Sequence, residues 1–419
     1  MLQIDHVYEF FYKTIFADKF DVYTCADGVV NPTEASFNNI HLFTPTLYTT
    51  EKIFFYDQEP LLVNITPHYL DIFNYPSTYS IKELIDRAIN STLPYGGVLA
   101  TTMTHEEIYN LEKIPPQYVY KNSKTIVISE ISALSTQYAT TYNARLLYYF
   151  FHGFAALDWY RGFYALNYNK QVVQEYKYDY ITFNRLVSND RSYRCYFISK
   201  LAEELLLEHG QISFGLATEQ ASWQEEIADV NTKLSTKAVD HIKLHLPSTP
   251  LIIDNEKVLG SASADIPRCT NDSLWHIVTE TVFYYDKLHL TEKIFKPIVM
   301  KQPFMLLGAI GNLAYLKSYG FKTFEGIIDE SYDTIVDNDA RTEAVVAQIA
   351  WYCALNAEEK QSVIEAIAPI VEYNFHHFYG EFKHIITREL LDNCKTLFKD
   401  IDYDDGAVAY DDIHRVLTS

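Results

Sequence analysis

The chain has 419 residues, of which 48% are hydrophobic and 21% are charged, and it carries a formal net charge of −21. This length exceeds what one hydrophobic core usually holds, so two domains are expected, and the composition excludes an intrinsically disordered chain. The acidic balance argues against a protein that binds a phosphate backbone over a broad basic surface.

The five cysteines are scattered and include no Cys-x-x-Cys pair. This pattern argues against a disulfide framework or a structural zinc site, and it favours a reducing cytoplasm. The amino-terminal residues lack the cationic start and the apolar run of a signal peptide. No stretch of about 18 apolar residues is present, so no membrane span is expected.

The first part of the chain alternates strand-like and helix-like segments, which is typical of an α/β fold. Short apolar runs predict strands at residues 52–56, 97–101 and 124–130. Helical spacing predicts helices at 80–90 and 136–159, the second with a large aromatic face.

The alternation restarts near residue 180. A long helix is expected at 191–209, with Asn189 and Asp190 as caps at its start and Gly210 at its end. Another helix is expected to begin at Thr291. The remaining predicted elements are strands at 180–183, 211–215, 275–279 and 304–307, a helix at 311–319, and mainly helical chain from Asp339 to an acidic tail at 402–412.

Several common fingerprints are absent from the sequence, namely GxGxxG, the Walker loop, HExxH and GxSxG. Two Asp-x-Asp strings, at 337–339 and 402–404, are expected to be solvated turns. The pair His376-His377 is expected to lie at the surface or in packing, because no acidic or cysteine partner has ligand spacing. No metal site is therefore expected.

The most informative segment is 275–324, where a strand, a loop and a helix follow one another. A helix that begins at Thr291 presents free N–H groups and partial positive charge, which suits a phosphate. Lys293 adds a full charge there, and Lys296 lies on the same helix face one turn later. Glu292 can accept two hydrogen bonds from a ribose diol. The alternative is a surface helix with a threonine cap and a glutamate in its first turn.

Arginines and carboxylates follow two other predicted strands. Arg191 and Arg194 lie in the first turn of the helix after strand 180–183, where cations oppose the helix dipole and suggest a bound anion. Asp57 and Glu59 follow strand 52–56, so either carboxylate is placed to face a cleft between domains. The alternatives are two exposed arginines and an ordinary polar turn.

The string Glu-Thr-x9-Thr-Glu-Lys-Ile-x-Lys, from Glu280 to Lys296, resembles the donor-binding signature of the α-1,3-fucosyltransferases and related GT-B glycosyltransferases. Thr281 stands where that family has asparagine. The segments 320–324 and 329–333 also resemble phage-encoded glycosyltransferase-like proteins, which suggests a viral protein in the cytoplasm of its host.

The resemblance implies a GT-B-like α/β fold, in which two Rossmann-like domains face a central cleft. The acceptor-side domain is expected at 1–175, the nucleotide-sugar-binding domain at 176–385, and a helical, acidic tail at 386–419. In that family the Thr-Glu-Lys glutamate binds the ribose hydroxyls and its lysine binds the diphosphate.

Carried over to this chain, the ribose role falls on Glu292 and the diphosphate role on Lys293, and Glu280 matches the upstream glutamate of the family. An arginine after the first donor-domain strand also contacts the diphosphate in related enzymes. Arg194 is the first choice for it and Arg191 the second. The family's catalytic base corresponds to Glu59, with Asp57 as competitor.

The implied function is an inverting, metal-independent transfer of a hexosyl, fucosyl or pentosyl group from a nucleotide sugar to a hydroxyl acceptor such as a glycan. A GDP-sugar is favoured over a UDP-sugar as co-substrate, and no cofactor is implied. Two alternatives remain. One is a phage glycosyltransferase that acts on hydroxymethylated bases of DNA, and the other is a non-catalytic binding protein on a decayed transferase fold.

Overall fold

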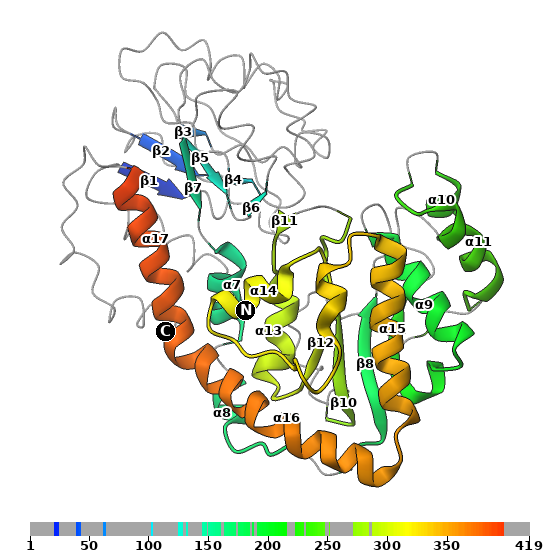
Figure 1. Ribbon diagram of the computed structural model, residues 1–419. Coiled ribbons are helices and arrows are strands. Elements are labelled where there is room, and N and C mark those ends of the chain that lie inside the picture. Colours follow the sequence, from blue (N-terminus) through cyan, green and yellow to red (C-terminus); the bar gives the residue numbers. More distant parts are fainter. Residues whose placement is uncertain are drawn as a thin grey trace. The chain divides into compact units, whose positions relative to one another are not determined.

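The protein is described from a computed structural model (Figure 1). The predicted strands 52–56 and 97–101, the predicted helix 80–90 and both candidate bases, Asp57 and Glu59, lie outside the described residues. The described residues are 21–24, 39–42, 62–63, 102–103, 125–128, 131–132, 145–148, 150–160, 163–172, 175–184, 187, 191–215, 223–229, 232–247, 251, 271–284 and 287–397.

The chain divides into two compact units. One unit comprises Met1–Trp159 together with His384–Ser419, and the other comprises Tyr160–Lys383. The carboxyl-terminal segment is thus grouped with the amino-terminal unit.

The first unit contains two parallel sheets among its described residues. Strands β1 (Asp21–Thr24), β2 (Asn39–Leu42) and β3 (Leu62–Val63) form one sheet in that order. The other has the order β4, β5, β7, with a short strand β6 following β5 in the chain. Their bounds are Thr102–Met103, Thr125–Ile128, Arg145–Tyr148 and, for β6, Ile131–Ser132.

The predicted helix at 136–159 is wrong in part. The helix α7 begins only at Phe151 and ends at Trp159, and strand β7 precedes it. Strand β7 is four residues long and holds an apolar run at 146–148, and so short a run fits a strand as well as a helix turn. The segment forms a strand because it pairs with β5, and no local sequence pattern reveals that pairing.

The second unit is built on a four-stranded, wholly parallel sheet in the order β12, β10, β8, β9 (Figure 1). Its strands are β8 (Tyr178–Asn184), β9 (Gly210–Phe214), β10 (Ser273–Thr279) and β12 (Phe304–Leu307). Every residue of β10 and β12 is buried, as expected for strands that are covered on both faces. The four strands predicted between 180 and 307 are confirmed, and with them an α/β fold.

The strand order reverses between β8 and β10. From β8 the chain passes through helix α9 (Tyr193–Glu203) to β9 on one side. From β10 it passes through helix α13 (Glu292–Val299) to β12 on the other side. Right-handed crossovers to opposite sides put their helices on opposite faces of the sheet, so β8 and β10 flank a topological switch point, as in Rossmann-like folds.

Helix α9 is shorter than the predicted 191–209. It ends at Glu203, and Leu205 turns the chain with a φ of 56° into a short 3-10 helix at Leu207–His209. Gly210 does not close the helix but opens β9. A Cβ atom on Gly210 would lie 2.3 Å from the ring of Tyr180, so glycine is required there by close packing.

Two short helices, α10 and α11, follow β9 and escaped the sequence analysis, whereas the later helices were predicted. Asn356 and Glu359 form a capping box at the start of α16, and Asp337 caps α15 through its side chain. The remaining elements are α8 (Phe163–Asn167), α10 (Trp223–Ala228), α11 (Thr236–His245), β11 (Lys287–Leu288), α14 (Asn312–Ser318), a 3-10 helix (Glu330–Thr334), α15 (Asn338–Ala354), α16 (Ala357–His377), a π-helical turn (Phe378–Phe382) and α17 (Lys383–Leu397).

The sequence segments 320–324 and 329–333 contact each other. Glu330 accepts hydrogen bonds from the hydroxyl of Thr323 and the backbone N–H of Phe324. Asp333 accepts hydrogen bonds from the first N–H groups of α14. Both segments therefore have an evident structural role in positioning α14 beside the sheet.

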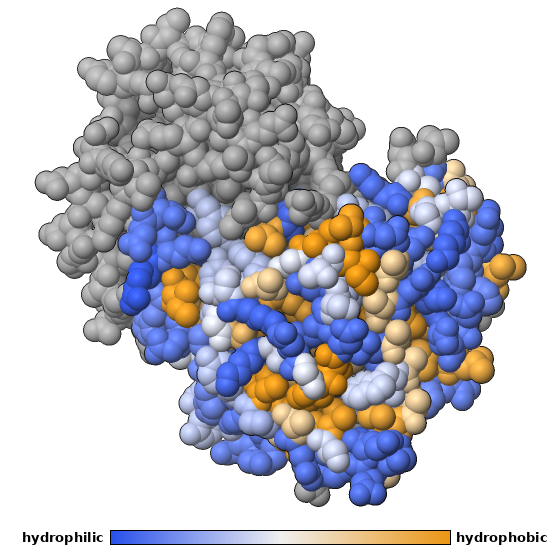
Figure 2. All heavy atoms as spheres, viewed as in Figure 1, coloured by the Kyte–Doolittle hydropathy of each residue, from blue (hydrophilic) through white to orange (hydrophobic). Residues whose placement is uncertain are grey.

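Within the described residues, no helix combines the length and the apolar character needed to cross a membrane. On the face shown in Figure 2, hydrophilic residues surround separate hydrophobic patches over the described elements. Exposed apolar side chains of this scattered kind are normal on protein surfaces.

Candidate functional site

The carboxyl ends of β8 and β10 bring together the chemistry-bearing residues of the second unit. β8 ends at Asn184, and β10 ends at Thr279, with Glu280 next in the chain. The hydroxyl of Thr279 donates to the carbonyl of Phe183 at 3.2 Å and joins the two strand ends. In open α/β sheets, ligands bind at the carboxyl edge where the strand order reverses, and this is that edge.

Glu280 anchors the start of helix α13. One carboxylate oxygen accepts the backbone N–H of Thr291 at 3.2 Å, and the other accepts the Thr291 hydroxyl and, at 3.3 Å, the N–H of Thr281. Thr291 itself is the N-cap and accepts the N–H of Lys293. Burial raises the pKa of Glu280, and the nearby Lys293 charge and the Thr291 hydroxyl lower it again in part. A carboxylate of the chain therefore occupies the position at Thr291 that the sequence analysis assigned to a phosphate.

Lys293 is the half-exposed cation of this group. Its ammonium group donates to the hydroxyl of Thr281 at 3.1 Å, to that of Thr291 at 3.3 Å and to Glu292 at 3.1 Å. The side chain of Lys293 is 30% exposed, whereas that of Glu292 is 8% exposed. An anion that approaches this edge thus meets Lys293, with Glu292 paired beside it.

Arg194 lies in the first turn of α9 and contacts the end of β10. Its Nη2 donates to the carbonyls of Thr279 at 2.8 Å and Glu280 at 3.3 Å, and the Tyr193 hydroxyl donates to the same Glu280 carbonyl. Burial lowers the pKa of Arg194, and the positive charge of Arg191 adds to that lowering. The guanidinium therefore fixes the end of β10, and Arg191 is a half-buried cation immediately before α9.

Lys296 lies against the sheet. Its ammonium group is 4.9 Å from the centre of the Phe183 ring, a cation–π distance, and it is 7% exposed. Burial and then the Lys296 charge lower the pKa of His276 on β10 to about 3. Lys296 thus adds positive charge beneath the carboxyl edge of the sheet.

Asn184 is a site residue that the sequence analysis did not select. It is fully buried, and its Nδ2 donates to the hydroxyl of Thr182 at 3.0 Å. Its Oδ1 is buried and has no hydrogen-bond partner within the described part of the chain. Buried acceptors are almost always satisfied, so the partner of this oxygen at the switch point is not among the described residues. The sequence signal was an asparagine directly after the apolar strand 180–183.

The structure thus gathers Glu280, Thr291, Glu292 and Lys293 around one helix start and joins Arg194 to them through Glu280. Among the described residues, the arrangement offers the half-exposed Lys293, a neighbouring carboxylate and the buried cations Arg194 and Lys296 at this edge of the sheet. Such a site suits a phosphorylated, hydroxyl-bearing ligand. The candidate bases Asp57 and Glu59 lie outside the described residues, so the site is described from the second unit alone.

No family model, curated protein or solved structure matches the chain in comparisons with known proteins.

Proposed function

We propose that the protein is a glycosyltransferase whose second unit binds a nucleotide sugar at the carboxyl edge of β8 and β10. The observation that carries this proposal is the position of Lys293 and Glu292 at the start of α13, immediately beside the topological switch point. A cation can bind the diphosphate of a nucleotide sugar, and a carboxylate can accept hydrogen bonds from its ribose diol.

The structure supports a refined assignment of roles. Lys293 contacts the diphosphate, and its three present acceptors are the groups that a phosphate oxygen would replace. Glu292, released from Lys293, accepts hydrogen bonds from the ribose. Glu280, Thr291 and Arg194 hold the start of α13 and the end of β10 in place and act as positioning residues.

The proposed reaction is an inverting, metal-independent transfer within a two-domain GT-B arrangement. A base, Glu59 in this proposal and Asp57 as the alternative, removes the proton of an acceptor hydroxyl. The acceptor oxygen attacks the anomeric carbon, and the bond between that carbon and the diphosphate oxygen breaks. Lys293 stabilises the negative charge that grows on the leaving nucleoside diphosphate, and one such contact contributes roughly 2–4 kcal/mol to the transition state.

The donor is proposed to be a GDP-sugar, on the resemblance of the Thr-Glu-Lys segment to the fucosyltransferases. A thermal-shift screen with GDP, UDP, their sugar conjugates and free phosphate tests this assignment without any acceptor. Stabilisation by GDP and its conjugates above all others is expected, because a ligand that binds only the folded state raises the melting temperature. Equal, small shifts for every anion would contradict a nucleotide site.

The catalytic proposal has a separate test. Glu59→Gln is expected to keep nucleotide binding and to lose sugar transfer, since the amide cannot accept the acceptor's proton. Slow release of free sugar from the donor provides an assay when no acceptor is known. Asp57→Asn serves as the matched variant, and full activity of Glu59→Gln would remove Glu59 from the mechanism.

A further inference from the structure

A second cluster of polar side chains lies between helices α9 and α11 of the second unit. His241 and His245 are one turn apart on α11 and therefore share a face. Glu203 is the last residue of α9, which packs on α11. The ligand atoms of these three side chains all lie within 4.8 Å of one another.

Each carboxylate oxygen of Glu203 faces one imidazole nitrogen. Nε2 of His241 lies 3.0 Å from Oε2, and Nε2 of His245 lies 3.9 Å from Oε1. Ligand atoms that are about 2.1 Å from a tetrahedral zinc ion are about 3.4 Å apart, so these two distances bracket that spacing.

The neighbouring hydroxyl of Ser199 holds the second ring nitrogen of His241. Ser199 is fully buried, and its hydroxyl lies 2.8 Å from the carbonyl of Tyr196. The same hydroxyl lies 2.9 Å from Nδ1 of His241 and shares a hydrogen bond with it. A ligating histidine is commonly held in this way through its second ring nitrogen.

Nε2 of His241 faces a carboxylate oxygen of Glu203 at 3.0 Å, a spacing that a bridging proton or a bridging metal ion fills. The rings of His241 and His245 are stacked with centres 4.5 Å apart, so both imidazoles lie against the same carboxylate. One shared divalent ion satisfies both nitrogens and the carboxylate together.

We propose that Glu203, His241 and His245 bind a zinc ion that clamps helix α11 to helix α9. Two imidazoles and a carboxylate form a set that suits zinc, with the fourth position left to water. Lys200, which also bonds Glu203, is the cation that the metal displaces.

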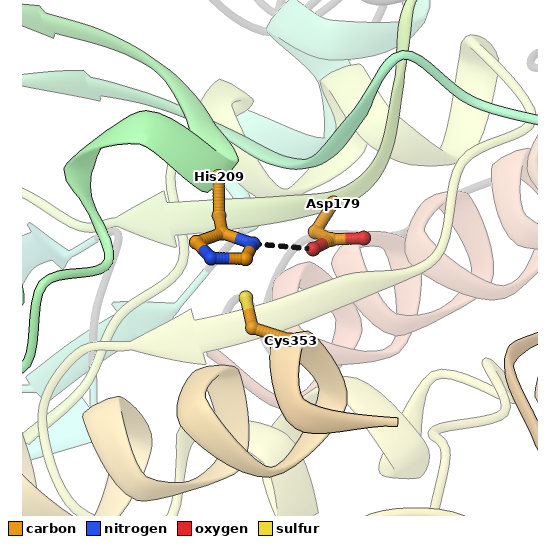
Figure 3. A group of neighbouring side chains, drawn as sticks. All are labelled: Asp179, His209 and Cys353. Atoms are coloured by element: carbon orange, nitrogen blue, oxygen red, sulfur yellow. Dashed lines mark hydrogen bonds and ion pairs between the residues drawn. The ribbon is translucent and has the colours of Figure 1, made fainter. Parts of the chain in front are cut away.

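Another group in the same unit, Asp179, His209 and Cys353, serves as an internal comparison (Figure 3). Both oxygens of its carboxylate are paired, one with Lys360 at 2.6 Å and the other with His209 at 3.0 Å. Burial and the Asp179 charge raise the pKa of the Cys353 thiol to about 12, so the thiol keeps its proton near neutral pH. The hydrogen bonds of this group link separate elements of the unit. A substitution in it therefore serves as a matched control for zinc binding at Glu203, His241 and His245.

The test is a titration of the full chain, stripped with a chelator, with Zn²⁺ by calorimetry and with Co²⁺ by absorption. One ion per chain is expected, with visible Co²⁺ bands and no thiolate-to-metal charge-transfer band. His245→Asn and Glu203→Gln are expected to weaken binding at least about tenfold, whereas Cys353→Ser binds as the unaltered chain does.

Circular dichroism of each variant confirms that the fold is retained. The absence of binding, unchanged affinity in both His245→Asn and Glu203→Gln, or a thiolate band that disappears in Cys353→Ser would each overturn the proposal. Nucleotide binding in the same variants is expected to stay unchanged, because Lys293 is not part of this cluster.

Discussion

The carboxylate of Glu280 accepts hydrogen bonds from both the backbone N–H and the hydroxyl of Thr291. A side chain at the end of β10 thereby closes the amino end of the helix that follows, across a loop of ten residues (281–290). This contact sets where α13 begins, and with it where Lys293 and Glu292 stand relative to the carboxyl edge of the sheet. The donor site proposed above depends on this arrangement.

Replacing Thr291 by valine tests the anchoring contact. The change keeps the shape of the side chain but removes the N-cap and the hydrogen bond to Glu280, so a loss of about 1–2 kcal/mol in the free energy of unfolding is expected. Urea denaturation measures it. Thr334→Val, which removes only an exposed bond to the Ser331 carbonyl, is the control and should change stability little. Equal effects in the two variants would mean that the cap is unimportant.

Replacing Asn184 is expected to change nucleotide affinity without lowering the stability of the fold. Because its Oδ1 is buried without a partner in the described residues, Asn184→Leu is expected to leave the unfolding free energy unchanged or to raise it by up to about 1 kcal/mol. Nucleotide affinity should fall in the same variant. Asn374→Leu is the matched control, since Asn374 is equally buried but bonds both backbone groups of Lys322.

The control should lose stability by about 1–3 kcal/mol. If Asn184→Leu loses stability as Asn374→Leu does, and binds nucleotide normally, Asn184 is an ordinary packing residue.

The buried His276 is expected to make the stability of the fold decrease as pH falls below 6.5. Its pKa is lowered from 6.5 to about 3 in the folded protein, so the unfolded chain binds the extra proton first as pH falls. The stabilisation is present above pH 6.5 and is lost toward pH 3, with about 2 kcal/mol lost by pH 5. Denaturation at pH 6.5 and pH 5 should therefore show a smaller drop for His276→Gln than for the unaltered chain.

The control for this measurement is His209→Gln, whose imidazole is 45% exposed. That variant should retain the full drop in stability between the two pH values. The same drop in His276→Gln as in the unaltered chain would show that His276 is not held neutral by burial.

Local sequence patterns were sufficient to predict much of the four-stranded sheet and the helix start at the candidate site. The run Phe304–Leu307 was predicted residue for residue, and Thr291 was predicted as the helix start, because apolar runs and caps act over a few residues. The early end of α9 was missed because Leu205 takes a positive φ and the Leu206 carbonyl accepts the Tyr180 hydroxyl, a contact from another strand.

The contacts that side chains make between elements could not be predicted from the sequence either. Arg194 was expected to meet a phosphate, and its contacts with the Thr279 and Glu280 carbonyls depend on how α9 packs beside β10. The spacing of His241 and His245 is visible in the sequence, but Glu203 joins them only through the packing of two helices. Pairings across elements are fixed by tertiary structure, and sequence pattern alone does not reveal them.

The most direct test of the account is a calorimetric titration of GDP into the unaltered chain and into Lys293→Met and Lys317→Met. Lys317 is a surface lysine of α14 that pairs with Glu325, so its replacement controls for the loss of one positive charge. We expect one site, about 10–150-fold weaker binding in Lys293→Met for the loss of a charge-assisted contact of about 1.5–3 kcal/mol, and unchanged binding in Lys317→Met. Equal affinity in Lys293→Met and in the unaltered chain would contradict the proposed donor site.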